Sequence, residues 1–130
     1  MGDPVIEVGV VVNDAEQMLP FYRDVLGLAP QEDWEVPGGV MKRFGHANEI
    51  IKLVVFDKPP EAKNPPMGIM GGSGIRYLTL YVDDLDGALA RCEAAGTPVP
   101  VPAFDYKPDM RVAIIEDPDG NWIELARITR

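Results

Sequence analysis

Apolar, β-branched runs alternate along this chain with segments of helical periodicity. Residues 5–12 form such a run and predict a buried or half-buried strand. Asn13 follows as a candidate N-cap, and the apolar positions in 15–26 recur at the spacing of one helical stripe. Pro20 lies inside this stripe and should bend the helix near its middle, whereas Gly27 is placed to end it.

The same order of elements returns at an offset of 70 residues, the separation of Asn13 and Asp83. Residues 75–82 predict a strand, Asp83 an N-cap, and 85–95 a helix that Gly96 ends. Further strand candidates follow each helix, at 40–46, 50–56, 110–116 and 122–128. The repetition predicts an internal duplication within one α+β domain.

A segment rich in proline and glycine joins the two halves. Two Pro-Pro pairs predict a stiff, extended connector, and a cluster of glycines after them restores freedom. We therefore expect a single domain over 1–130, with a first module at about 4–57, a linker at 58–73 and a second module at about 74–130. Three apolar linker residues are expected to close over a pocket, to contact a second subunit or to pack on the core: Met67, Ile69 and Met70.

Composition places the chain among ordinary globular proteins. It has 130 residues, of which 46% are hydrophobic and 25% charged. A single cysteine, Cys92, excludes an intrachain disulfide and suits a reducing compartment. The sequence has neither an apolar run of the roughly 20 residues needed to cross a membrane nor the pattern of a signal peptide. We expect a cytoplasmic protein that does not associate with membranes.

The net charge of the chain disfavours some classes of binding partner. Twelve basic residues against 21 acidic ones give a formal net charge of −9, which repels nucleic acids and anionic lipid surfaces. Such a charge favours a cationic ligand, unless the binding pocket differs locally from the surface. The chain also has only one histidine, His46, whereas metal sites with imidazole ligands commonly use several.

Three sequence motifs resemble those of a known family. They are Phe-Tyr-Arg-Asp-Val-Leu-Gly-Leu at 21–28, Val-Asp-Asp-Leu-Asp at 82–86, and Asp-Pro-Asp-Gly-Asn-Trp-Ile-Glu-Leu at 117–125. With the duplicated pattern, they strongly resemble the vicinal oxygen chelate superfamily, which includes glyoxalase I, extradiol dioxygenases and the bleomycin and fosfomycin resistance proteins. The resemblance implies two βαβββ modules that form a cupped mixed sheet with the helices on the outside. It says little about the reaction, because one fold hosts many functions.

In metal-binding members, four side chains from symmetric strands meet inside the cup. The resemblance places Glu7, Lys52, Tyr77 and Glu124 at those positions. An ammonium group has no lone pair and repels a divalent cation, and a neutral tyrosine is a poor ligand. The sequence around His46 predicts a hairpin turn, where a histidine is more often exposed to solvent than bound to a metal. We therefore predict no metal and no cofactor.

Without a metal, Lys52 would be flanked by Glu7 and Glu124, either as a structural ion pair or as catalytic machinery. Aromatic and methionine side chains on the cup suit a flat, partly apolar organic ligand. The candidate ligand-binding residues are Trp34, Met41, Phe56, Thr79, Tyr81, Phe104, Tyr106 and Met110.

Three functions remain open at this point. The favoured one is a metal-free protein that binds or sequesters a small molecule, as in the bleomycin-resistance group. The alternative is a metal-independent isomerase or lyase in which Glu7 or Glu124 is the base and Lys52 or Tyr77 stabilises an oxyanion. A metal-dependent lyase or dioxygenase is least favoured. We also expect a homodimer, because two-module family members commonly dimerise and open sheet edges need covering.

Overall fold

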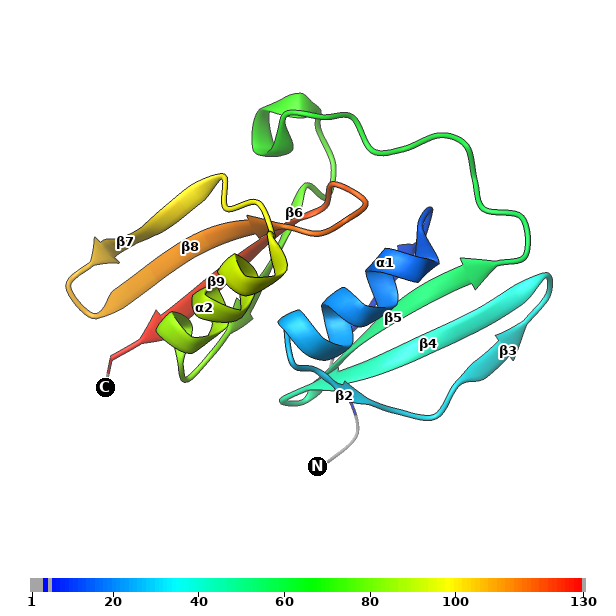
Figure 1. Cartoon of the computed structure of the whole chain (residues 1–130), viewed down its shortest axis with the longest axis horizontal. Helices are drawn as coiled ribbons and strands as arrows, with labels where there is room; N and C mark the ends of the chain where they lie inside the picture. The colour runs from blue at the N-terminus through cyan, green and yellow to red at the C-terminus, as the bar shows by residue number, and fades with distance from the viewer. Residues whose placement is uncertain (1–3, 5, 130) are drawn as a thin grey trace. The chain divides into compact units, whose positions relative to one another are not determined.

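The computed structural model describes residues 4 and 6–129 and divides the chain into two compact units, Met1–Lys63 and Asn64–Arg130. Each unit contains one α-helix and one mixed sheet (Figure 1). Within each unit a strand is followed by a helix and then by further strands. The predicted α+β fold of two modules is thereby confirmed, and each module has a sheet of its own.

The first unit is built on its two longest strands. Its elements are β1 (Ile6–Val11), α1 (Ala15–Pro20), a π-helical turn (Phe21–Val25), β2 (Ala29–Pro30), β3 (Trp34–Val36), β4 (Gly39–His46) and β5 (Glu49–Phe56). The strand order is β1-β5-β4-β2, and β3 pairs with β4. β1 runs parallel to β5, and the other pairs are antiparallel.

The second unit repeats this plan with four strands. Its elements are a 3-10 turn (Gly68–Gly71), β6 (Tyr77–Tyr81), α2 (Leu85–Ala95), β7 (Val101–Lys107), β8 (Met110–Glu116) and β9 (Trp122–Ile128). The order is β6-β9-β8-β7, with β6 parallel to β9. β1 and β6 therefore hold the same place, each at an edge of its sheet beside the last strand of its unit.

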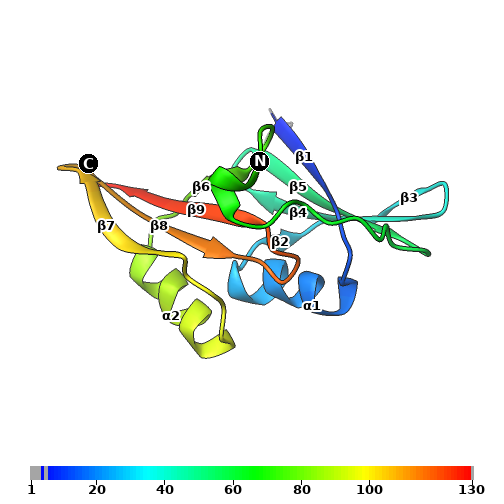
Figure 2. The ribbon, with the colours of Figure 1, turned by 90° about the horizontal axis from the view of Figure 1, so that it is seen from above.

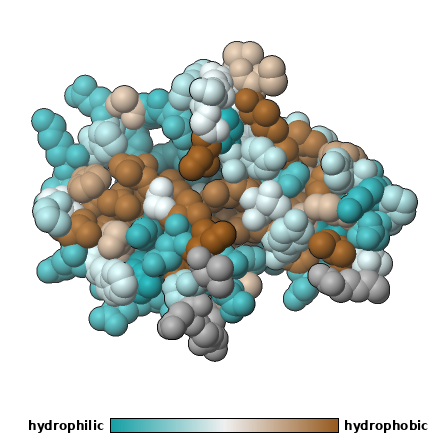
Figure 3. Space-filling view, turned by 180° about the vertical axis from the view of Figure 1, so that it is seen from behind, coloured by the Kyte–Doolittle hydropathy of each residue, from teal (hydrophilic) through white to brown (hydrophobic). Residues whose placement is uncertain are grey.

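Each helix packs on one face of the sheet of its own unit, and the core of the unit lies between them (Figure 2). In the first unit this core includes Met18, Phe21, Tyr22, Phe44, Ile51 and Leu53. In the second it includes Leu85, Ala88, Cys92, Ile115, Ile123 and Leu125. We call the opposite side of each sheet, away from its helix, the far face; apolar side chains lie exposed there among polar ones (Figure 3).

Both helices begin where the sequence predicts, but each N-cap lies one residue later than expected. Asp14, not Asn13, is the N-cap of α1, and its Oδ1 accepts a hydrogen bond from the Gln17 amide at 3.3 Å. Asn13 instead donates from Nδ2 to the Pro60 carbonyl oxygen at 2.9 Å, which ties the connector to this unit. Asp84 caps α2 in the same way as Asp14 caps α1.

Pro20 changes the first helix as its chemistry requires. The α-helix ends at Pro20 and continues as a π-helical turn, in which the Leu26 amide donates to the Phe21 carbonyl oxygen five residues earlier. Because proline lacks a backbone donor, the regular ladder cannot run through it. Gly27 follows the C-cap Leu26, and its φ of 72° is the left-handed conformation that glycine adopts easily.

No helix in the described part of the chain is both long and apolar enough to span a membrane.

Candidate functional site

Lys52 lies at the centre of the far face of the first unit. Its Cα partners are Gly9 in β1 and Arg43 in β4, so the three residues form one row across the sheet. A Cβ built on Gly9 would lie 3.7 Å from Lys52 Cε, which places the aliphatic arm of Lys52 over the position where Gly9 has no side chain. Within the first unit, at residues 4 and 6–63, no carboxylate lies within 4.0 Å of the Lys52 ammonium.

Arg43 makes the ion pair that was expected of Lys52. Its Nη2 lies 3.8 Å from Glu7 Oε1, and its guanidinium carbon lies 3.9 Å from the centroid of the Trp34 ring, in cation–π geometry. The Arg43 side chain is only 12% exposed, against 33% for Glu7. Its buried Nε has no hydrogen-bond partner among the described residues, which is a costly state for a charged donor.

An apolar row lies beside this charged row. The cross-strand partners Val11, Val54, Met41 and Trp34 follow one another from β1 through β5 and β4 to β3. Val11 and Trp34, at the two ends, are 51% and 46% exposed. Of the predicted ligand-binding residues, Trp34 and Met41 are thus brought together, and Phe56 lies at the end of β5 on the same side.

The equivalent row of the second unit has different chemistry. Thr79 and Glu124 are Cα partners, and Thr79 Oγ1 donates to Glu124 Oε1 at 2.8 Å. They occupy the register positions that Gly9 and Lys52 hold in the first unit. Tyr77, 44% exposed, is the partner of Trp122, whose Nε1 donates to Glu116 Oε1 at 3.0 Å.

The linker forms a strap against Trp122. A Cβ built on Gly68 would clash with the indole ring, so glycine is needed for the strap to lie this close. Arg76 holds the strap by donating from Nε to the Gly68 carbonyl oxygen and from Nη2 to the Pro65 carbonyl oxygen, both at 2.8 Å. The three apolar linker residues are exposed, at 76% for Met67, 43% for Ile69 and 83% for Met70, so packing on the core is not their role.

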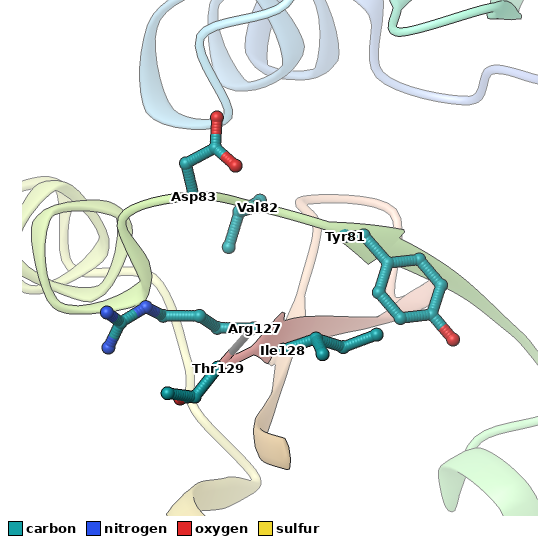
Figure 4. A pocket seen from close by; sticks show the side chains of 6 residues that line it. All are labelled: Tyr81, Val82, Asp83, Arg127, Ile128 and Thr129. Atoms are coloured by element: carbon teal, nitrogen blue, oxygen red, sulfur yellow. The ribbon is translucent and has the colours of Figure 1, made fainter. Parts of the chain in front are cut away.

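An open pocket of about 480 Å³ lies at the end of β6 and β9. It is lined by Tyr81, Val82, Asp83, Arg127, Ile128 and Thr129. Tyr81 and Ile128 lie on one side, and the Arg127 guanidinium points away on the other (Figure 4). Tyr81 is the one predicted ligand-binding residue among them.

The other predicted ligand-binding residues of this unit lie along its outer strands. Phe104 and Tyr106, in β7, are 44% and 65% exposed. Met110 begins β8 and is half-buried as the partner of Ile128. Neither Phe104 nor Tyr106 lines the pocket at the end of β6, although Phe104 lies in the same cross-strand row as Tyr81, through Val112 and Ala126.

The positions expected to hold ligands do not form a metal-binding cluster among the described residues. In the described residues, no group of three or more His, Cys, Asp or Glu side chains could hold an ion. Glu7 lies beside a guanidinium, and His46 ends β4 at the hairpin, as expected. Cys92 is buried in α2, where burial raises the pKa of its thiol despite the opposing effect of Arg91.

Sequence reasoning missed Arg43 and assigned its partner Glu7 to Lys52. The signal was nevertheless in the chain: the hairpin turn at Ala47 and Asn48 pairs residues whose numbers add up to 95, as Arg43 and Lys52 do. Alternation along the paired strands then puts both side chains on one face.

Comparisons with known proteins agree with this architecture. Residues 5–125 match the model of the Glyoxalase/Bleomycin resistance protein/Dioxygenase superfamily. The chain is 26% identical to the uncharacterized protein YaeR of Escherichia coli (strain K12), with 93% of each chain covered.

Two solved structures are also similar. TnmS3, an antibiotic binding protein from Streptomyces sp. CB03234, is 25% identical with a TM-score of 0.70, covering 99% of this chain and 98% of that one. Lactoylglutathione lyase from Agrobacterium tumefaciens is 26% identical with a TM-score of 0.63, covering 97% and 94%. The chain therefore belongs to the Glyoxalase/Bleomycin resistance protein/Dioxygenase superfamily.

Proposed function

We propose that this protein binds a small, partly aromatic organic molecule without a metal, as a binding or sequestering protein of its superfamily. One observation carries the proposal: the far face of the first unit presents Lys52 and Arg43 beside the half-exposed indole of Trp34. Two cations repel a divalent metal, whereas an exposed aromatic ring beside fixed polar groups suits an organic ligand.

Similarity to an antibiotic binding protein over nearly the whole chain supports this proposal. Further support comes from the exposed aromatic side chains of the second unit, among them Tyr77, Tyr81 and Phe104. The candidate ligand contacts remain Trp34, Met41, Phe56, Thr79, Tyr81, Phe104, Tyr106 and Met110. A homodimer in the cytoplasm is part of the same proposal, since β1 and β6 are edge strands and the one free cysteine suits a reducing compartment.

A second candidate is a metal-independent enzyme. Its specific support is Glu124, a carboxylate on the far face of the second unit that Thr79 holds by a hydrogen bond. In this version Glu7 or Glu124 removes a proton, and Lys52 or Tyr77 stabilises the resulting oxyanion. Turnover that disappears in Glu124→Gln but survives exhaustive chelation would favour this candidate over sequestration.

The test combines native mass spectrometry with elemental analysis on protein purified without added metal. We expect less than 0.1 equivalent of zinc, iron or manganese per chain, a dimer mass, and binding of aromatic compounds by chelator-treated protein. One equivalent of metal retained through a mild chelator, with ligand binding that depends on it, would overturn the proposal.

A further inference from the structure

We propose that the far face of the first unit is a subsite for a carboxylate, so that the ligand is an aromatic monocarboxylate and not the cation that the net charge of −9 favours. This inference deepens the proposed function and rests on it. It depends on the side chains of Arg43, Lys52 and Glu7 and on the apolar row beside them.

The charge of the subsite is opposite to that of the whole chain. Arg43 and Lys52 are cross-strand partners, an arrangement in which like charges repel and cost stability. Glu7 balances one of them, at an N–O distance of 3.8 Å that is too long for a hydrogen bond. Two cations and one carboxylate leave one positive charge, which matches a ligand with a single negative charge.

Hydrogen-bonding capacity points the same way. Within the first unit, at residues 4 and 6–63, the ammonium of Lys52 has no carboxylate partner and the buried Nε of Arg43 has no acceptor. The planar guanidinium is already held against the Trp34 ring, so little side-chain freedom is lost when it binds a ligand. A carboxylate offers two acceptor oxygens in the geometry that a guanidinium recognises best.

The spacing of the rows sets the shape of the ligand. The charged row of Gly9, Lys52 and Arg43 lies two residues along the strands from the apolar row of Val54, Met41 and Trp34. At roughly 3.3 Å per residue, the backbones of Lys52 and Val54 are about 7 Å apart, whereas the Arg43 guanidinium reaches back over the Trp34 ring. A flat apolar body of two fused rings, with the carboxylate attached directly to one ring, has these dimensions.

The experiment compares three probes of one shape: 2-naphthoate, 2-naphthamide and 2-naphthylmethylammonium. Each is titrated into chelator-treated protein at low salt, and the indole N–H signals of Trp34 and Trp122 are followed by NMR, with Trp34→Phe to assign them. We expect naphthoate to shift the Trp34 signal and to bind at least tenfold more tightly than the amide. The cation should bind most weakly.

Variants separate the subsite from the rest of the protein. Arg43→Met and Lys52→Met should each weaken naphthoate binding about tenfold and leave amide binding within twofold. Glu7→Gln should tighten naphthoate binding, because it removes the competing carboxylate. Lys42→Met is the matched control, since Lys42 precedes Arg43 in β4, points to the opposite side and is paired with Asp33.

The outcomes distinguish the two levels of the proposal. Equal binding of naphthoate and amide, or tighter binding of the cation, would overturn the carboxylate subsite and leave metal-free aromatic binding standing. Failure of all three probes to bind at millimolar concentration would count against both. A loss in Lys42→Met equal to that in Arg43→Met would show a general charge effect and overturn the subsite.

Discussion

Thr79 donates a 2.8 Å hydrogen bond from Oγ1 to Glu124 Oε1 across the parallel β6–β9 pair. The equivalent pair in the first unit is Gly9 and Lys52, where a lysine arm covers a residue that has no side chain. The equivalent strand pair therefore orients the Glu124 carboxylate in the second unit, whereas in the first unit it makes room for the Lys52 side chain.

Replacing Thr79 tests the value of this hydrogen bond. Thr79→Val keeps the shape of the side chain but removes the donor, so Glu124 loses its partner on a half-buried face. We expect the free energy of unfolding to fall by about 1–2 kcal/mol, measured by urea denaturation. Thr79→Ser keeps the hydroxyl and should stay closer to wild type; equal losses in both variants would contradict a role for the hydrogen bond.

Gly68→Ala should push the strap away from Trp122. The added Cβ clashes with the indole, and the φ of 52° at this position disfavours any side chain. We expect a loss of about 1–3 kcal/mol in the free energy of unfolding, together with a red shift in tryptophan emission. Gly72→Ala is the control, because a Cβ there meets nothing closer than Pro65 Cγ at 3.8 Å. No change in emission for Gly68→Ala would contradict the contact.

Cys92 should resist thiol reagents in the native protein. It is fully buried, and burial raises the pKa of its thiol, so little reactive thiolate forms near pH 8. We expect labelling by a disulfide reagent to be slow and to become rapid in denaturant. Fast labelling of the folded protein would place Cys92 outside the core.

The same shift predicts a pH dependence of stability. Because the pKa of Cys92 is higher in the folded state than in the unfolded state, the contribution of the protonated thiol is fully present below the unfolded pKa, about 8.5. It is lost as the pH rises through the folded pKa. Denaturation at pH 7 to 10 should show this alkaline loss in wild type and a smaller one in Cys92→Ala.

The exposed linker residues should contribute to assembly. Met67 and Met70 are the most exposed methionines of the strap, and they suit a contact with a second copy or with bound ligand. We expect a dimer in sedimentation velocity at micromolar concentration and dissociation by Met70→Lys. Glu93→Lys, on the exposed side of α2, is the charge control. A wild-type monomer would contradict the homodimer.

Much of the fold could be predicted because two signals coincide. Runs of β-branched residues mark the strands. Gly27 and Gly96, which adopt the left-handed conformation after the first helical segment and after α2, repeat at nearly the same offset as the capping residues. The caps themselves were misplaced by one residue, at Asn13 and Asp83. Both neighbours in each pair are good caps. In the first pair, Asn13 makes a tertiary hydrogen bond to Pro60 instead, which the sequence does not reveal.

The site was harder to predict, because its chemistry depends on pairing across strands. Lys52 was expected to pair with Glu7, yet Glu7 lies 3.8 Å from Arg43. Lys42 and Arg43 are adjacent in sequence and chemically alike, but they point to opposite sides, one toward Asp33 and the other onto Trp34. Only the register of β4 against β5 separates their roles.

The way the connector is fastened marks a place to divide the chain. On the first unit, Asn13 donates a hydrogen bond to the Pro60 carbonyl oxygen. On the second unit, Asn64 donates to Asn121 Oδ1, and Arg76 donates to the carbonyl oxygens of Pro65 and Gly68. A break between 61 and 63 therefore leaves every one of these tethers inside its own fragment. Two separately encoded halves cut at this point would be a natural starting pair for a split-protein sensor, in which ligand or partner reports on their reunion.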